Sequence, residues 1–238
     1  MTLNVGLLLC DHVPEPLKAR FNDYPNMLEI AFSKLGKEII WNVFDACHGF
    51  LPTKTEALDG YIISGSKSSA NDSADWIEKL SFLIQELREK NIPTVGLCFG
   101  HQLMSKVCGG VVDISKTGWG VGCKKFRLTD SRSWMAGTLE TLIVPAFHQE
   151  QIVSLPENSM VLGHTNYCEN FFIQFDARML GIQGHPEFET EYVSALLDER
   201  LAVLSPETIL EAERSLALTT DSVLIRQWIY EFLTKESS

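Results

Sequence analysis

The stretch TVGLCFGHQ, residues 94–102, decides the fold of this chain. Apolar and β-branched residues over 92–95 predict a strand, Gly96-X-Cys98-X-Gly100 predicts a tight turn, and residues 101–107 are compatible with a helix. The two glycines let the backbone turn without Cβ clashes, so that the side chain between them is exposed beside the helix N-terminus. The free amides and the dipole of that terminus favour a thiolate over a thiol. The stretch therefore predicts Cys98 as a nucleophile between a strand and a helix.

A second motif, QGHPEF at residues 183–188, supplies a candidate base and a group that orients it. The preceding residues 179–183 read as a buried strand. Residues i and i+2 of an extended segment project to the same side, so we expect His185 and Glu187 to lie side by side. In a Cys-His-Glu triad, His185 takes the thiol proton and returns it to the leaving group, while Glu187 orients the ring. An ordinary turn would explain His-Pro-Glu alone, but both motifs fall at strand ends, which favours catalysis.

Residues 96–102 and 184–187 together resemble the class I (triad) glutamine amidotransferases, above all the branch around the amidotransferase domain of GMP synthetase. Further segments resemble stand-alone members of that branch, including the plant γ-glutamyl peptidases. They are DYPNM at 23–27, SGS at 64–66 followed by DWI at 75–77, GWGVG at 118–122, and FHQE at 147–150. The similarity extends from about residue 6 to residue 188. It implies the flavodoxin-like α/β fold of this family. The sequence shows no internal repeat, low-complexity segment or linker, so we expect a single domain over residues 1–238.

An oxyanion site requires backbone amides aimed at the oxygen of a tetrahedral intermediate. The amide of Phe99, directly after the nucleophile, is one candidate donor. The loop SGSKSS, residues 64–69, follows the preceding parallel strand and offers the other. The resemblance assigns this role to Gly65, although the amide of Ser66 is an alternative and a plain Gly/Ser turn is a third reading.

The substrate-binding candidates are Gln102, Ser66 and His148. The resemblance implies that Gln102 helps to form the pocket for a glutamine side chain; its alternative is a helix-surface residue that caps the turn. His148, in the FHQE segment, lines the pocket wall or makes a strand-end hydrogen bond. His101 is predicted to be structural, because the helix turns it away from Cys98.

Alternating strands and helices predict an open, mostly parallel sheet with helices on both faces. Strands are expected over residues 4–10, 39–44 and 60–64, and helices over 26–35 and 74–90. Between residues 110 and 175 the pattern changes to short strands and turns, which predicts a small antiparallel excursion within the same domain. Parallel sheets bind ligands beyond the carboxyl ends of their strands, where both motifs fall.

Two helices are expected at the end of the chain, over residues 206–217 and 222–233. Ser205 and Asp221 are their predicted N-caps. In the last helix, Arg226 and Gln227 are assigned to the polar face. Packing positions in that helix are predicted to be Val223, Trp228 and Phe232.

Composition limits the classes of partner. The chain has 238 residues, 45% of them hydrophobic, and 31 acidic against 20 basic residues give a net charge of −11. No basic run exceeds Lys124-Lys125, so we expect no nucleic-acid partner. No stretch approaches the roughly 20 apolar residues of a membrane span, so no membrane partner is expected. A homodimer is compatible with the sequence, but no surface feature requires one.

The cysteines and histidines show no metal-site spacing. The six cysteines include no C-x-x-C pair, and His12, His48 and His164 offer no paired ligand spacing. We therefore expect no metal, no disulfide framework and a reducing, cytoplasmic location. Neither a P-loop nor a dinucleotide motif occurs, so no cofactor is expected.

The expected activity is hydrolysis of a γ-glutamyl amide, with glutamine as the first candidate substrate, through a thioester on Cys98. In one version the chain is a glutaminase that passes ammonia to a separate synthetase subunit. In another it acts alone as a γ-glutamyl peptidase or hydrolase on a conjugate. A silent binding or regulatory module is a weaker third reading, because all three triad positions are filled.

Overall fold

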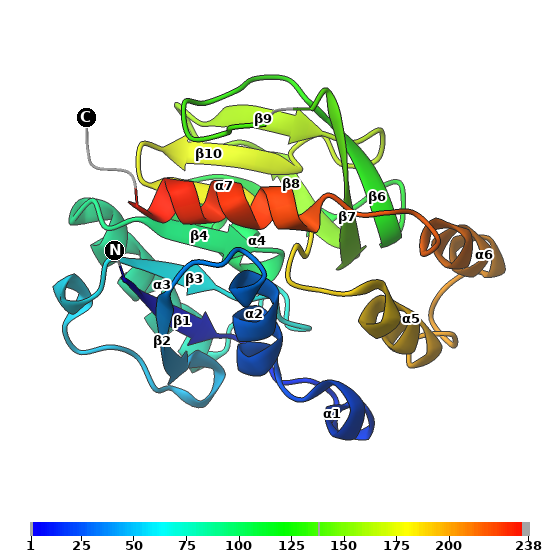
Figure 1. The fold of residues 1–238 in the computed structure, drawn as a ribbon, viewed down its shortest axis with the longest axis horizontal. Helices are drawn as coiled ribbons and strands as arrows, with labels where there is room; N and C mark the ends of the chain where they lie inside the picture. Colours follow the sequence, from blue (N-terminus) through cyan, green and yellow to red (C-terminus); the bar gives the residue numbers. More distant parts are fainter. Residues whose placement is uncertain (1, 138, 235–238) are drawn as a thin grey trace.

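The computed structural model describes residues 2–137 and 139–234, which form an α/β fold around one large sheet (Figure 1). The nine strands follow the order β2-β1-β3-β4-β11-β10-β9-β6-β7. Five neighbouring strands are parallel: β1 (Leu3–Leu9), β2 (Ile39–Asp45), β3 (Gly60–Ile63), β4 (Thr94–Leu97) and β11 (Met179–Ile182). The prediction of an α/β sheet with strands near residues 4–10, 39–44, 60–64 and 179–183 is confirmed.

The expected antiparallel segment extends the same sheet. Its four strands are β6 (Gly120–Leu128), β7 (Thr141–His148), β9 (Met160–His164) and β10 (Phe172–Asp176). A separate antiparallel pair consists of β5 (Val111–Ile114) and β8 (Glu150–Ser154). Strand β10 joins the two halves, because it runs antiparallel to β11 at the end of the parallel half.

Helices cover both faces of the sheet, with α7 and α2 in front in Figure 1. The α-helices are α1 (Glu15–Phe21), α2 (Tyr24–Ser33), α3 (Asp75–Glu89), α4 (Phe99–Val107), α5 (Thr190–Asp198), α6 (Pro206–Ser215) and α7 (Ser222–Thr234). Two short 3-10 helices are η1 (Ala46–His48) and η2 (Thr55–Ala57). Ser205 caps α6 as predicted, because its side chain accepts a hydrogen bond from the amide of Thr208. Helices α1 and α5 were not predicted. Helix α1 buries no residue fully; its apolar contact is limited to Leu17 and Phe21, which are partly buried against a small hydrophobic cluster.

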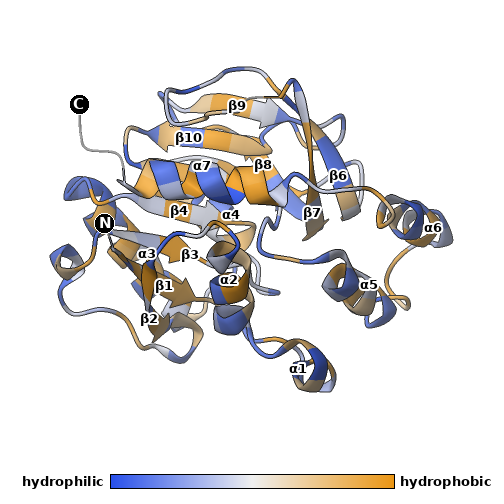
Figure 2. Cartoon of the chain, viewed as in Figure 1, coloured by the Kyte–Doolittle hydropathy of each residue, from blue (hydrophilic) through white to orange (hydrophobic). Residues whose placement is uncertain are grey.

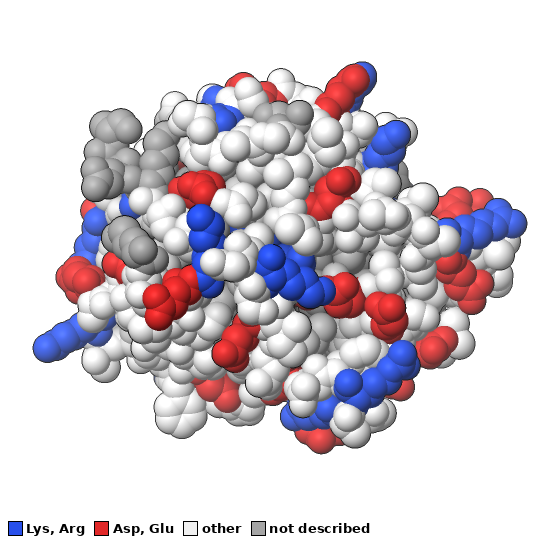
Figure 3. All heavy atoms as spheres, viewed as in Figure 1, with Lys and Arg blue, Asp and Glu red and all other residues white. Residues whose placement is uncertain are grey.

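The sheet separates two hydrophobic cores because successive side chains of a strand point to opposite faces. In β1, Leu7 joins the core under α2 and α7, while Leu8 joins the core under α3 and α4. Figure 2 shows the hydrophobic colour concentrated on the strands, whereas α7 carries hydrophobic and hydrophilic residues. Lys and Arg are interspersed with Asp and Glu on the face drawn in Figure 3. Within the described residues, no helix is both long and apolar enough to cross a membrane.

Two assignments in α7 were wrong. Arg226 is only 1% exposed, and Val223 is 50% exposed. The apolar pattern of α7 does not indicate that the side carrying Arg226 is buried as well. That side packs against the turn after β11, where Arg226 donates a hydrogen bond to Pro186 O. Trp228 and Phe232 are buried as predicted. The carboxylate of Asp221 accepts a hydrogen bond from the amide of Ile143 and so ties the start of α7 to β7.

Candidate active site

Cys98 lies at the sharp turn between β4 and α4. Its φ of 49° and ψ of −99° lie in a region that residues with a side chain rarely adopt. Hydrogen bonds hold the turn on both sides, because the Cys98 amide donates to Ile182 O at 2.9 Å and the Gln102 amide donates to Cys98 O at 3.0 Å. The predicted strand–turn–helix arrangement around the thiol is therefore present. The prediction that the side chain is exposed was wrong: Cys98 is only 6% exposed, because it faces a cavity rather than the open surface.

The glycines on either side of Cys98 are required by close backbone contacts. A Cβ atom on Gly96 would lie 2.5 Å from the backbone of Gly100 and His101. A Cβ atom on Gly100 would lie 2.5 Å from the carbonyl oxygen of Ile63 in β3. No real Cβ atom tolerates such distances, so the turn needs glycine at both positions.

The turn after β11 places His185 and Glu187 together. His185 Nδ1 lies 2.7 Å from Glu187 Oε1, and both side chains are about 95% buried (5% and 4% exposed). The His185 amide donates to Pro145 O in β7, and its ring stacks on Phe188 with centroids 4.1 Å apart. Burial on its own lowers the pKa of His185, but the charges of Glu187 and Cys98 and hydrogen bonds to both raise it to about 10. The groups around the ring therefore favour its protonated, imidazolium form.

Gly65 lies beside both His185 and Cys98. A Cβ atom on Gly65 would lie 2.7 Å from His185 Cε1 and 3.7 Å from Cys98 Cβ. Next to it, Ser64 is structural, since its Oγ accepts a hydrogen bond from the Cys10 amide at 2.9 Å. Ser66 Oγ accepts from the amide of Ser68 and so shapes the same loop. Only a residue without a side chain fits at position 65.

A cavity of about 300 Å³ opens beside the thiol. Its lining contains most of the residues that the sequence indicated: Gly65, Ser66, Cys98, Gln102, His148, His185 and Glu187. The Phe99 side chain packs instead in the core with Trp76, at a centroid distance of 5.5 Å. Phe99 is the first residue of α4, and the first amides of a helix have no hydrogen-bond partner within it.

The wall of the cavity is tied together by hydrogen bonds. Gln102 Nε2 donates to Glu150 O at 2.7 Å and to Gln183 Oε1 at 3.1 Å. His148 Nδ1 lies 2.9 Å from Glu150 O, and burial lowers the pKa of His148 to about 4. The ring is therefore neutral and donates from Nδ1, which leaves the lone pair on Nε2. That nitrogen has no hydrogen-bond partner within the described part of the chain.

Two residues at the site were missed by the sequence analysis. Gln183 Nε2 lies 3.5 Å from Cys98 Sγ. Arg226 Nη1 donates a hydrogen bond to Pro186 O at 2.5 Å. Pro186 lies between His185 and Glu187 in the sequence. A polar residue at the end of an otherwise apolar strand was a signal for Gln183. For Arg226 no local signal existed. His101 is structural as predicted: it is fully buried, its Nε2 lies 3.0 Å from Asn170 O, and burial lowers its pKa to about 3.

Comparison with known families agrees with this geometry. Residues 24–200 match the family model "Glutamine amidotransferase class-I". The chain belongs to the class I glutamine amidotransferases. γ-Glutamyl peptidase 3 of Arabidopsis thaliana is 29% identical over 203 residues, which cover 82% of this chain and 80% of that protein. A glutamine-hydrolysing GMP synthase subunit of Methanopyrus kandleri is 30% identical over 146 residues, 58% of this chain and 71% of that protein.

The amidotransferase fold is shared over almost the whole chain. A glutamine amidotransferase of Thermotoga maritima of known structure superimposes with a TM-score of 0.77 at 21% identity, covering 99% of this chain and all of that one (100%). At that identity the likeness shows the fold alone. The expected resemblance and fold are therefore confirmed, and this amidotransferase is a family hydrolase with γ-glutamyl peptidases among its relatives.

Proposed function

We propose that this amidotransferase hydrolyses a γ-glutamyl amide through a thioester on Cys98. The observation that carries the proposal is the meeting of three strand ends at one cavity. Cys98 follows β4, the His185–Glu187 pair follows β11, and Gly65 follows β3. A nucleophile, a base with its orienting carboxylate and a glycine loop that can present amides are the parts that acyl transfer requires.

The reaction proceeds in two steps. The Cys98 thiolate attacks the γ-carbonyl carbon, and the tetrahedral oxyanion forms against the amides of Phe99 and Gly65. The C–N bond then breaks as the His185 imidazolium protonates the departing amine or ammonia. In the second step the neutral ring takes a proton from water, and hydroxide adds to the thioester carbonyl carbon. The C–S bond then breaks, glutamate leaves, and the thiolate of Cys98 and the imidazolium of His185 are regenerated. Glu187 orients the ring in both steps and stabilises it whenever it is charged.

The substrate class that we propose is a γ-glutamyl conjugate cleaved without a partner protein. Similarity to several γ-glutamyl peptidases over about four fifths of both chains supports it, as for peptidase 3 (82% and 80%). Gln102, Ser66 and His148 then bind the glutamyl group from the cavity wall. The buried, unpartnered Nε2 of His148 supports such a role, because within the described residues it is an acceptor that the protein leaves free.

A second candidate is a glutaminase that depends on a synthetase. The similarity to the glutamine-hydrolysing GMP synthase subunit favours it. In this version glutamine is the substrate, and the ammonia passes to a separate synthetase. The purified chain would then be slow until the partner is added.

The test is hydroxylamine trapping with purified protein. We expect glutamate release from a γ-glutamyl dipeptide and, with hydroxylamine present, γ-glutamyl hydroxamate. Cys98→Ala should abolish both products, while Cys108→Ala, outside the cavity lining, should leave them unchanged. Full activity of Cys98→Ala would refute the thioester. Silence of the folded wild-type chain on γ-glutamyl peptides and glutamine, followed by glutamine turnover once a GMP synthetase is added, would favour the second candidate.

A further inference from the structure

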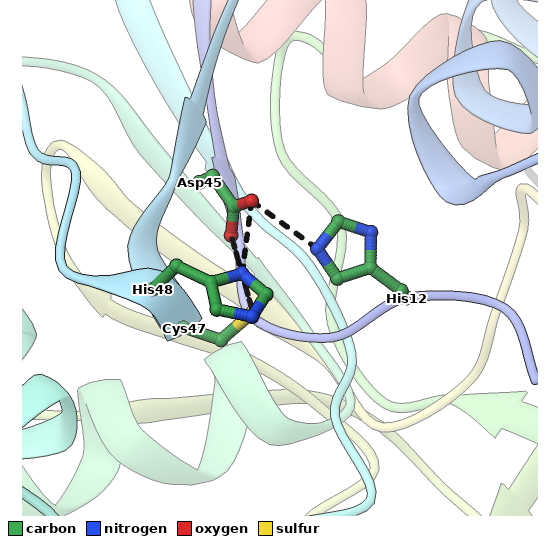
Figure 4. A group of neighbouring side chains, drawn as sticks. All are labelled: His12, Asp45, Cys47 and His48. Atoms are coloured by element: carbon green, nitrogen blue, oxygen red, sulfur yellow. Dashed lines mark hydrogen bonds and ion pairs between the residues drawn. The ribbon is translucent and has the colours of Figure 1, made fainter.

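A cluster of metal-binding side chains lies outside the catalytic triad, at the carboxyl ends of β1 and β2 (Figure 4). It consists of His12, Asp45, Cys47 and His48. Each offers one ligand atom, and these atoms all lie within 4.8 Å of one another. His12 comes from the loop after β1, whereas the other three come from the end of β2 and from η1. Two segments that are distant in sequence therefore converge on one point.

The spacing of the ligand atoms fits a tetrahedral cation. Asp45 carboxylate oxygens lie 3.2 Å from His12 Nε2, 3.2 Å from Cys47 Sγ and 3.0 Å from His48 Nδ1. Cys47 Sγ lies 3.7 Å from His48 Nδ1. A tetrahedral zinc with bonds of about 2.0–2.3 Å has edges of about 3.3–3.8 Å between its ligands. These four separations are close to the tetrahedral edges. The four ligand atoms all lie within 4.8 Å of one another, so the side chains must move closer together before all four bind one ion.

The second nitrogen of His12 is held in the way that metal-binding histidines require. His12 Nδ1 lies 2.6 Å from Asp23 Oδ2, so it can donate its proton there and leave the Nε2 lone pair facing the cluster. A carboxylate behind the ring is typical of histidine ligands, because it selects the tautomer and the ring orientation. Asp23 is itself anchored, since its other oxygen accepts hydrogen bonds from the amides of Val13 and Tyr24.

We propose that His12, Asp45, Cys47 and His48 bind a divalent zinc ion with a structural role. Two imidazoles, one carboxylate and one thiolate suit zinc, and four protein ligands fill a tetrahedron without a position for substrate. On binding, zinc replaces the thiol proton of Cys47, which is released to solvent. The His48 side chain is 62% exposed, which gives the ion a route in from solvent.

The site connects to the wall of the catalytic cavity. His12 and its neighbour Asp11 both line that cavity. The Asp11 carboxylate accepts a hydrogen bond from the amide of Lys67, in the loop that carries Gly65, at 2.9 Å. A zinc ion on His12 therefore fixes the segment that contacts the Gly65 loop.

The experiment is a metal titration in the Cys98→Ala chain, which removes the catalytic thiol as a competing ligand. After treatment with a chelator, we expect Co²⁺ to give a thiolate charge-transfer band and tetrahedral d–d bands that saturate at one ion per chain. Zn²⁺ should displace the Co²⁺ and raise Tm, because it binds only the folded state. Cys47→Ser should remove the charge-transfer band, and the matched control Cys108→Ser should keep it.

A second variant keeps the result interpretable if Cys47→Ser does not fold. His48→Ala changes a side chain that is mostly exposed and should weaken zinc binding by about tenfold or more. The proposal is overturned if Cys98→Ala itself eliminates the metal bound by the wild-type chain, which would place the ion on the catalytic thiol. It is also overturned if folded Cys98→Ala binds no ion, or if Cys47→Ser and His48→Ala bind it as before.

Discussion

At the scale of single residues, Cys98 differs from the other five thiols in its surroundings. Burial raises the pKa of Cys47 to about 12, of Cys108 to about 11 and of Cys168 to about 12, and it also raises the pKa values of Cys10 and Cys123. These groups stay protonated at neutral pH and react slowly. Cys98 instead lies at a helix N-terminus beside the His185 imidazolium.

This contrast predicts selective labelling. A glutamine-like chloroketone or diazoketone should modify one cysteine per chain, and peptide mass spectrometry should place the adduct on Cys98. Cys98→Ala should lose the label, whereas Cys123→Ala should keep it. A main adduct on any other cysteine would contradict the assignment of the nucleophile.

The histidine and its carboxylate make different contributions, which predicts an order of effects. His185→Ala should remove nearly all turnover, because both proton transfers depend on the ring. Glu187→Gln should retain about 10- to 100-fold more activity, because it removes only charge support and orientation. Steady-state kcat/KM on the same γ-glutamyl substrate measures both. Near-wild-type rates in either variant would exclude that residue from the mechanism.

At the scale of elements, α7 packs against the turn that carries His185 and Glu187. Arg226 Nη1 donates to Pro186 O. Burial lowers the pKa of the Arg226 guanidinium, and the nearby charges of Glu189 and Glu187 oppose that lowering. The charge of a buried arginine is therefore stabilised in part by the same carboxylate that orients His185. This couples the packing of the last helix to the geometry of the active site.

Removing this support should weaken both the fold and catalysis. Arg226→Ala leaves a buried carbonyl without a donor, which typically costs about 1–3 kcal/mol of unfolding free energy. The control is Val223→Ala, on the exposed side of the same helix, which should change the unfolding free energy by less than about 0.5 kcal/mol. Urea unfolding and kcat measure the two effects. Equal stability and equal kcat in the two variants would exclude Arg226 as a positioning residue.

At the scale of the whole molecule, strand order brings the site together. β3, β4 and β11 are consecutive neighbours in the sheet and run parallel, with Ile182 opposite Leu97 and Ile63 opposite Gly96. Their carboxyl ends therefore reach the same edge, so residues 65, 98 and 185 meet although they are far apart in sequence. This is the general position of ligand sites in open parallel sheets.

The sequence by itself determined the parts of this site that depend on local chemistry. Glycines around Cys98 predict the tight turn, which follows from backbone geometry over a few residues. The same holds for the Ser205 cap. His185 and Glu187 lie together as predicted, but for another reason: β11 ends at Ile182, and residues 185–188 form a turn in which the Phe188 amide donates to His185 O, rather than an extended segment. Each of these signals lies within one helix, one turn or one strand.

Only the tertiary structure decided which distant segments pack together. The burial of Arg226 depends on a turn 40 residues earlier in the chain. The contact of Gln183 with Cys98 depends on β11 pairing with β4, and the cluster of His12 with Cys47 and His48 depends on β1 lying beside β2. Spacing along the chain showed no metal-site pattern, because these ligands come together through strand pairing. The hydrophobic periodicity of a segment predicts which of its residues pack into the core. Which other segment buries a polar side chain depends on the packing of the whole chain.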